Sequence, residues 1–267
     1  MPLLSYSSDD VAGVNIAKVL RENFGYKEYE EVFEGTPVCE KDGVKLVQSE
    51  ENITRRTGFA DFKPDVCIVL SRHRSKSGAP TLTTHATGNF GSADLGGEPG
   101  RLGTAPAQYL YKSLEYLKLN QVGGYDVSRE VTHHGPTELD FPLMYIEVGS
   151  DLPQWNDMNA VTAVAEVADA LATLPVDDIP AGIGFGGTHY APNFSQITGV
   201  AVGHIMPKHA MEFLDDAMFR QLIEHTWPKP KYCVLDWKGL KGEHKNLLKD
   251  LAPAHGLELV KTTDLKP

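Results

Sequence analysis

The chain has 267 residues, of which 41% are hydrophobic and 23% charged, a composition typical of a folded protein with enough core for one large domain or two smaller ones. Its formal net charge of −11 argues against broad electrostatic binding of nucleic acid but does not exclude a local basic patch. No apolar run reaches membrane-spanning length, the first residues do not resemble a secretion signal, and the cysteines form no paired motif. We therefore expect a cytoplasmic protein with reduced thiols and no membrane contact.

The N-terminal half alternates between helical and strand-like segments. Residues 7–23 carry Ser and Asp capping candidates followed by apolar residues at helical spacing, which predicts the first helix. The short apolar run 64–71 predicts a strand buried on both faces. The segment 72–103 is rich in glycine and has little periodicity, so we expect a long functional loop there. A helix over 104–120 and a strand over 141–150 are predicted next.

The C-terminal half continues this alternation. Helical spacing returns over 156–174, and two glycine-rich apolar runs predict strands over 179–187 and 197–205, followed by a helix over 208–225. The end of the chain predicts a strand, a helix and a strand over 231–237, 241–252 and 257–261. This order indicates an α/β fold around a mainly parallel or mixed sheet flanked by helices, and with no convincing linker we expect a single domain over 1–267.

Histidines gather where the predicted strands end, which is where ligands bind in open α/β sheets. They stand beside glycine- and proline-rich turns and form no HExxH or Cys/His motif, so no sequence rule proves a metal site. Any one of them can be a hydrogen-bonded core residue, but several at strand ends favour a site that uses imidazole as a zinc ligand or general base. The candidates are His85, His133, His134, His189 and His204.

Two neighbouring histidines raise a geometric question. On a regular strand the side chains of His133 and His134 would point to opposite faces, so both can face one site only if the chain turns there. Gly135 and Pro136 follow directly and predict that turn. Glu147 lies in an otherwise apolar strand whose other face holds Met144, Ile146 and Val148, and a buried carboxylate there needs a metal or a histidine as partner.

Two short stretches are basic in this acidic chain. Residues 55–76 and 227–249 each contain six Lys or Arg residues against two acidic ones. Such stretches are usually solvated surface, but they can also form a face that contacts phosphate. We interpret His73 as a structural or exposed residue, although Arg72 and Arg74 on either side of it could make it part of a phosphate site. The chain has no GxSxG, Walker or GxGxxG fingerprint, which leaves hydrolysis by activated water or binding without chemistry.

The histidine motifs resemble those of a known family. "HHGPT" at 133–137, "IEVGS" at 146–150 with "QWND" at 154–157, "GFGGTHYAP" at 184–192 and "VGHI" at 202–205 are similar to motifs of the D-aminoacyl-tRNA deacylases of the archaeal and plant type. The resemblance runs from "YSSDDVAGVNIAKVL" near the N-terminus to "LDWKGLKGEHK" near the C-terminus, essentially the whole chain.

The resemblance implies an enzyme that hydrolyses the ester between a D-amino acid and tRNA, which recycles tRNA and keeps D-residues out of translation. It also implies zinc dependence and a three-layer α/β fold similar to peptidyl-tRNA hydrolases and nucleoside phosphorylases. The resemblance also strengthens the interpretation of the two basic stretches as contacts to tRNA phosphates. We expect a monomer, because the sequence has no heptad repeat and no evident exposed apolar stripe.

Roles for individual residues follow as hypotheses. We expect zinc on His134 and His189 with His204 or His85, and catalysis by His133, His134, Glu147 and His189, with Glu147 or His133 as the general base. The backbone N–H groups of Gly186 and Gly187 would stabilise the oxyanion, and the Gly-Pro turn or Thr188-His189 would crowd the side chain of an L-residue. The expected substrate-binding residues are Arg72, Arg74, Gly135, Pro136, Thr137, Gly186, Gly187, Thr188 and Tyr190.

Two other functions remain open from the sequence. A phosphorylase- or esterase-like enzyme could use the same strand-end pocket on a small nucleoside or ester, and it would turn over small substrates and be indifferent to intact tRNA. A tRNA-binding protein without catalysis would bind with a steep salt dependence and release no amino acid.

Overall fold

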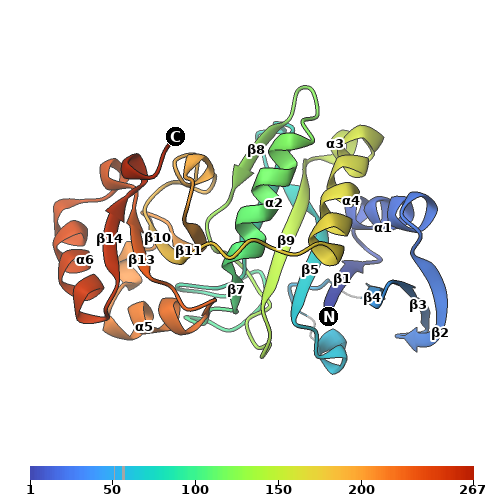
Figure 1. Ribbon diagram of the computed structural model, residues 1–267, viewed down its shortest axis with the longest axis horizontal. Helices are drawn as coiled ribbons and strands as arrows, with labels where there is room; N and C mark the ends of the chain where they lie inside the picture. The colour runs from blue at the N-terminus through green and yellow to red at the C-terminus, as the bar shows by residue number, and fades with distance from the viewer. Residues whose placement is uncertain (51, 56–57) are drawn as a thin grey trace.

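The computed structural model describes residues 1–50, 52–55 and 58–267, so Arg56 of the first basic stretch lies outside the described residues. Its centre is an 8-stranded sheet with the order β2-β3-β4-β1-β5-β9-β6-β8 (Figure 1). The strands of this large sheet are β1 Pro2–Ser7, β2 Lys27–Phe33, β3 Thr36–Lys41, β4 Val44–Ser49, β5 Val66–Arg74, β6 Thr81–Ala86, β8 Asp126–Arg129 and β9 Leu143–Ser150. The sheet is mixed, because β4, β1, β5 and β9 run parallel whereas β6 pairs antiparallel with β9.

A second, 4-stranded sheet has the order β11-β10-β13-β14 and is parallel throughout. Its strands are β10 Ala181–Phe185, β11 Ala201–Met206, β13 Tyr232–Leu235 and β14 Glu258–Lys261, and a short pair, β7 Ala105–Pro106 and β12 Thr226–Trp227, lies beside it. This small sheet lies with α5 and α6 at one end of the molecule, and β2 and β3 lie at the other (Figure 1). The helices are α1 Val11–Asn23, α2 Ala107–Leu119, α3 Leu152–Trp155, α4 Met158–Thr173, α5 Asp216–Glu224 and α6 Gly242–Ala254.

Side-chain alternation along the strands decides which face of the large sheet the helices cover. The even-numbered residues of β9, Met144, Ile146 and Val148, belong to the same core as the apolar faces of α1, α2 and α4. The odd-numbered residues therefore point to the opposite face. There, Leu143 and Tyr145 pack with apolar residues of β1, β4 and β5 and with the short 3-10 helix η1, Gly58–Phe62. Glu147 lies further along this same face, as the alternation predicts.

The α/β fold around a mixed sheet with flanking helices is confirmed, whereas the long loop expected over 72–103 is wrong in its first part. Strand β5 continues to Arg74, and Thr81–Ala86 form the buried strand β6. Pairing supplies the reason, because β9 binds β5 on one side and β6 on the other. Cross-strand partners of this kind override weak local propensity.

The helix predicted over 208–225 is also shorter than expected. The chain forms a 3-10 turn at Met211–Phe213, and α5 begins only at Asp216. Asp215 is the reason, because its carboxylate accepts a hydrogen bond from the backbone N–H of Met218 and so caps a new helix. Within the described part of the chain, no helix is long and apolar enough to span a bilayer.

Candidate active site

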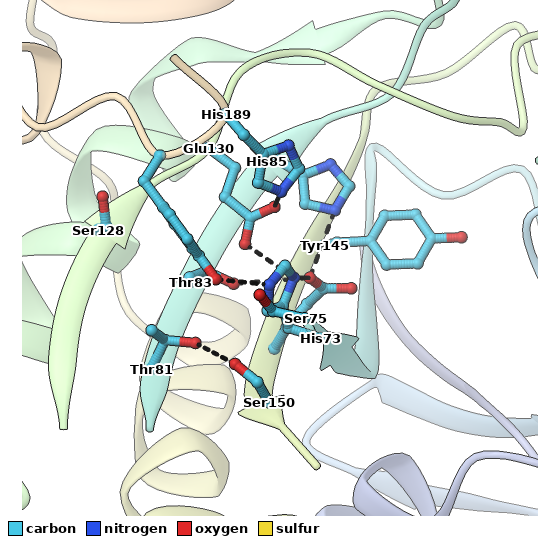
Figure 2. A network of polar contacts seen from close by, with 12 residues as sticks. His73, Ser75, Thr81, Thr83, His85, Ser128, Glu130, Tyr145, Ser150 and His189 are labelled. Atoms are coloured by element: carbon cyan, nitrogen blue, oxygen red, sulfur yellow. Dashed lines mark hydrogen bonds and ion pairs between the residues drawn. The ribbon is translucent and has the colours of Figure 1, made fainter. Parts of the chain in front are cut away.

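Seven side chains that can bind a metal or carry a proton meet on the face of the large sheet opposite its helices. We call them the His/Glu cluster: His73 on β5, His85 on β6, Glu147 on β9, Glu130, His133 and His134 after β8, and His189 after β10. Figure 2 shows His73, Glu130 and His189 close together, with Tyr145 beside them. The cluster joins residues more than 100 positions apart, because strands from both sheets contribute to it.

Backbone contacts after β8 bring the two sheets together at this point. The N–H of Val131 donates to the carbonyl of His189 at 3.0 Å, and the N–H of Thr132 donates to the carbonyl of Ile205 at 3.0 Å. Glu130 also forms an isolated bridge with Tyr190. The loop that carries Glu130, His133 and His134 is therefore fixed against the small sheet, which positions His189 over the large one.

Three histidines form the first potential metal-binding group. His85, His133 and His134 each offer a ring nitrogen that lies within 4.8 Å of the other two. The Nδ1 atoms lie at hydrogen-bond distance from backbone carbonyls, 3.1 Å from Ala86, 2.8 Å from Val131 and 2.8 Å from Gly135 respectively. When Nδ1–H donates to a carbonyl, Nε2 keeps its lone pair, and this arrangement is common for metal-binding histidines. The Nε2 atom of His85 is buried and has no hydrogen-bond partner among the described residues.

The backbone at His134 explains how two successive histidines reach one site. Its φ angle is +39°, in the left-handed region that turns the chain sharply. The rings of His133 and His134 consequently lie 4.5 Å apart between centroids, at nearly a right angle. The prediction that the chain turns here to place both side chains in one site is confirmed.

Glu130 is the centre of the second potential metal-binding group. Its carboxylate oxygens lie 3.1 Å from Nδ1 of His73 and 2.9 Å from Nε2 of His189. Its side chain is 0% exposed, and neither oxygen has a well-directed hydrogen bond from any described residue. Donor atoms around a tetrahedral zinc with bonds of about 2.0 Å lie roughly 3.3 Å apart, which is close to these spacings. Both groups therefore offer donor atoms that suit a metal ion such as zinc, and the spacing in this second group is close to that of a tetrahedral site.

The two carboxylates of the cluster are ionised despite their burial. Burial opposes the charged form of Glu130, but the His189 imidazole 2.9 Å away and the other nearby histidines lower its pKa to about 2. Burial likewise opposes ionisation of Glu147, and His85 and His73 hold the pKa of this carboxyl well below its usual range. The cluster therefore contains two buried negative charges, which favour a bound cation.

The cluster environment shifts the pKa values of its histidines in opposite directions. Burial and the proximity of His85 lower the pKa of His133 well below its usual value and that of His134 to about 4, so both are neutral at pH 7. Burial also opposes the charged form of His73, but its hydrogen bond to Glu147 and the charge of Glu130 raise its pKa. Neutral imidazoles can bind metal, whereas the raised pKa of His73 favours its protonated form beside the two carboxylates.

A cavity of about 780 Å³ opens beside the cluster, within the usual size range of small-molecule sites. Cluster residues in its wall are His73, His133, His134, Glu147 and His189. Three cationic side chains also line it, namely Arg72, Arg74 and Lys76. The cavity therefore places potential metal ligands and phosphate-binding groups on one surface.

The structure does not bring His204 into the cluster. Its Nδ1 lies 3.0 Å from Oγ1 of Thr132, and its Nε2 lies 3.0 Å from the carbonyl oxygen of Gly103 and 3.1 Å from that of His225. Both ring nitrogens are thus occupied in a buried structural network. The sequence expectation that His204 binds metal does not fit this placement, because no lone pair is left for a metal.

The glycines before His189 have a structural role that differs from the expected oxyanion hole. The N–H of Gly186 donates to the carbonyl of Met206 at 2.8 Å and is unavailable to a substrate. Gly186 and Gly187 have φ angles of +104° and +86° and are buried, and neither lines the cavity. They turn the chain so that His189 can reach Glu130.

The other expected substrate-binding residues divide between the cavity and its supports. Arg72 and Arg74 line the cavity, and Arg72 also donates to the carbonyl of Asp9 at 2.6 Å. Tyr190 lies behind, with its hydroxyl 2.8 Å from Nε2 of His73. Thr188 is exposed and donates to the carbonyl of Tyr190, outside the cavity lining.

Gly135, Pro136 and Thr137 are buried and lie outside the cavity lining. A Cβ atom on Gly135 would lie 2.4 Å from the backbone N of Gly97 and 2.5 Å from the carbonyl oxygen of Thr54. Thr137 accepts a hydrogen bond from the N–H of Glu98 at 2.8 Å. These residues therefore fix the glycine-rich segment against the histidine loop.

Replacing Gly135 with alanine is expected to destabilise the protein by about 3 kcal/mol or more, because the new methyl group would collide with backbone atoms that cannot move aside cheaply. The measurement is the midpoint of urea unfolding. Gly123→Ala is the matched control, since nothing lies within 4 Å of its Cβ position, and it should change stability by no more than about 0.5 kcal/mol. Equal stability of both variants would contradict the packing role of Gly135.

The sequence reasoning missed Glu130 altogether and left His73 as a structural or exposed residue. Glu130 lies between Arg129 and Val131, both of which are buried. The rule that identified Glu147, a carboxylate at the end of a buried strand that needs a partner, applies equally to Glu130. His73 was hidden by its charged neighbours, which suggested a loop where β5 continues.

Comparison with known proteins agrees with these motifs. Residues 60–260 match the family model described as D-aminoacyl-tRNA deacylase. The D-aminoacyl-tRNA deacylase of Thermococcus kodakarensis is 37% identical over 98% of this chain and 100% of its own length, and that of Pyrococcus abyssi is 35% identical over the same shares. A solved structure of a "conserved protein of unknown function" superposes with a TM-score of 0.91 at 28% identity, covering 100% of this chain and 96% of the other. The chain belongs to the D-aminoacyl-tRNA deacylase family.

Proposed function

We propose that this protein hydrolyses the ester bond between a D-amino acid and tRNA, with the His/Glu cluster as its catalytic centre. The observation that carries the proposal is the convergence of five histidines and two buried carboxylates beside a cavity, in a chain of this family. We also propose a monomer, because the sequence has no heptad repeat that would suggest a partner helix. Because aminoacyl-tRNA is used in translation, we place the enzyme in the cytoplasm.

The proposed zinc ligands are Nε2 of His85, His133 and His134. Support comes from the three Nδ1 atoms that lie near backbone carbonyls and from the buried Nε2 of His85, which has no hydrogen bond among the described residues. This assignment replaces His204 with His133 and moves His189 to the second group. Zinc bound there would supply a Lewis acid that polarises the ester carbonyl and lowers the pKa of water.

His189 is the proposed proton carrier, and Glu130 orients it. The side chain of His189 is 46% exposed and lines the cavity, whereas the Glu130 carboxylate that pairs with Nε2 of His189 is fully buried. The Glu130 carboxylate stabilises the imidazolium that forms when His189 takes a proton from the attacking water. The same proton can then pass to the ribose oxygen as the ester C–O bond breaks, which yields the free D-amino acid and tRNA.

Glu147 is proposed to hold the cluster together, where the sequence suggested a general base. It is 3.5 Å from Nδ1 of His73 and 3.7 Å from Nε2 of His85, so it links both groups. The ring of Tyr145 stacks on that of His85, with 5.0 Å between the ring centroids, and so fixes the orientation of this imidazole. Both residues line the cavity.

The cavity is the proposed seat of the aminoacylated terminal adenosine. Arg72, Arg74 and Lys76 line it and can contact the phosphates that follow the terminal nucleotide. The rings of His134 and His189 stand in its wall, and we propose that they crowd the side chain of an L-amino acid. Gly135 and Pro136 lie outside the cavity lining, and their proposed role is to hold His134 in place.

The test compares cleavage of D-tyrosyl-tRNA and L-tyrosyl-tRNA before chelation, after it and after zinc is restored. We expect D-selective cleavage that is lost on chelation and recovered with zinc. Cleavage that ignores chelation would remove zinc from the mechanism but keep the deacylase. An enzyme that cleaves only small esters or nucleosides, or no ester at all, would contradict the proposed function.

A further inference from the structure

Three lysines converge on one tryptophan outside the cluster. The ammonium nitrogens of Lys245, Lys249 and Lys261 lie 4.9, 5.4 and 5.1 Å from the ring centroid of Trp237. Trp237 begins the 3-10 helix η4, Trp237–Gly239, two of the lysines come from α6, and Lys261 ends β14. We call these four residues the Trp/Lys platform.

The platform lies at the carboxyl edge of the small sheet, on the same edge as the turn that carries His189. Strands β10, β13 and β14 are parallel, so Gly186, Asp236 and Lys261 follow or end neighbouring strands at one edge. The 3-10 helix η4, which contains Trp237, packs against this turn, because a Cβ atom on Gly239 would lie 3.3 Å from the backbone N of Gly187. The platform and the active-site turn therefore form adjoining parts of one surface.

The charge of the platform is not balanced by the protein. Among the described residues no carboxylate forms an ion pair with Lys245, Lys249 or Lys261, although the whole chain carries a formal charge of −11. The nearest paired lysine is Lys241, 3.7 Å from Glu243. Three ammonium groups around one ring repel each other, and cation–π attraction offsets this only in part. A polyanion that bridges them would remove the repulsion.

We propose that the Trp/Lys platform binds the sugar-phosphate backbone of the tRNA acceptor arm while the aminoacyl end occupies the cavity. The inference rests on the proposed function. Tryptophan fixes the three ammonium groups in one place, and phosphate contacts position a nucleic acid without reading its sequence. Lys261 lies outside the basic stretch 227–249 found in the sequence, and only the fold brings it to the other two lysines.

The test uses Lys245→Gln/Lys249→Gln in the full chain. We expect the Kd for uncharged tRNA, measured by filter binding, to rise about tenfold at physiological salt, and the slope of log Kd against log salt to fall by roughly 1 to 2. The KM for D-tyrosyl-tRNA should rise with little change in kcat. Turnover of D-tyrosyl-adenosine, which lacks the arm, should remain unchanged.

Lys229→Gln/Lys231→Gln is the matched control, because both lysines are exposed and precede β13 at the opposite edge of the same sheet. It should bind tRNA like the unaltered protein. Unchanged tRNA binding in the platform variant, an equal loss in the control, or slower turnover of D-tyrosyl-adenosine would each overturn the proposal. Failure of the unaltered protein to cleave D-tyrosyl-tRNA would instead defeat the proposed function, and tRNA binding would still decide the role of the platform.

Discussion

Replacing Glu130 with glutamine is expected to lower the rate of D-tyrosyl-tRNA cleavage by about 10²- to 10³-fold. The amide has the shape of the carboxylate but no charge, so His189 would lose the anion that stabilises its protonated form. His73 would lose one of the two carboxylates that raise its pKa. The measurement is the single-turnover rate with enzyme in excess, which isolates chemistry from product release.

The metal content of this variant distinguishes two roles for Glu130. If it acts through His189, as proposed, the variant should keep the zinc bound to the three-histidine group while it loses its rate. Loss of zinc together with the rate would make Glu130 a ligand instead. Glu166→Gln is the matched control, because Glu166 is exposed on α4 and far along the chain from the cluster, and its rate should not change. A normal rate in Glu130→Gln would remove the residue from catalysis.

How far the sequence predicts this site depends on which contacts are local. Alternation along β9 correctly set Glu147 opposite Met144, Ile146 and Val148. The Gly-Pro pair correctly predicted a turn at His134. These inferences succeed because period-2 alternation and turn chemistry act over a few residues.

The errors arise where pairing between distant segments decides the structure. Local composition ended β5 at residue 71, but parallel pairing with β9 extends it to Arg74 and places His73 in the cluster. His204 also lies near the end of a strand, after Gly203, yet its ring turns to Thr132 and to the carbonyls of Gly103 and His225. A strand-end position therefore identifies a candidate, and the side-chain partners decide whether it can bind a metal.

His134 and His204 provide a direct comparison of a proposed ligand with a structural histidine. Replacing His134 with alanine should reduce bound zinc, measured by elemental analysis after dialysis, and lower the rate of D-tyrosyl-tRNA cleavage by about 10²-fold or more. The physical reason is the loss of a neutral imidazole whose Nε2 lone pair has no other partner in the hydrogen-bond network, since Nδ1 already faces the carbonyl of Gly135.

Replacing His204 with alanine should have the opposite pattern. The variant should keep its zinc, because both ring nitrogens of His204 bond to protein groups. It should lose about 1 to 3 kcal/mol of stability, because Thr132 and the carbonyl groups of Gly103 and His225 would each lose a hydrogen bond in a largely buried network. Thermal unfolding and zinc content measured on both variants separate the two roles. Zinc loss in His204→Ala, or full zinc and full rate in His134→Ala, would contradict the proposed ligand set. The comparison is informative because the sequence suggested both histidines as zinc ligands, whereas only His134 lines the cavity.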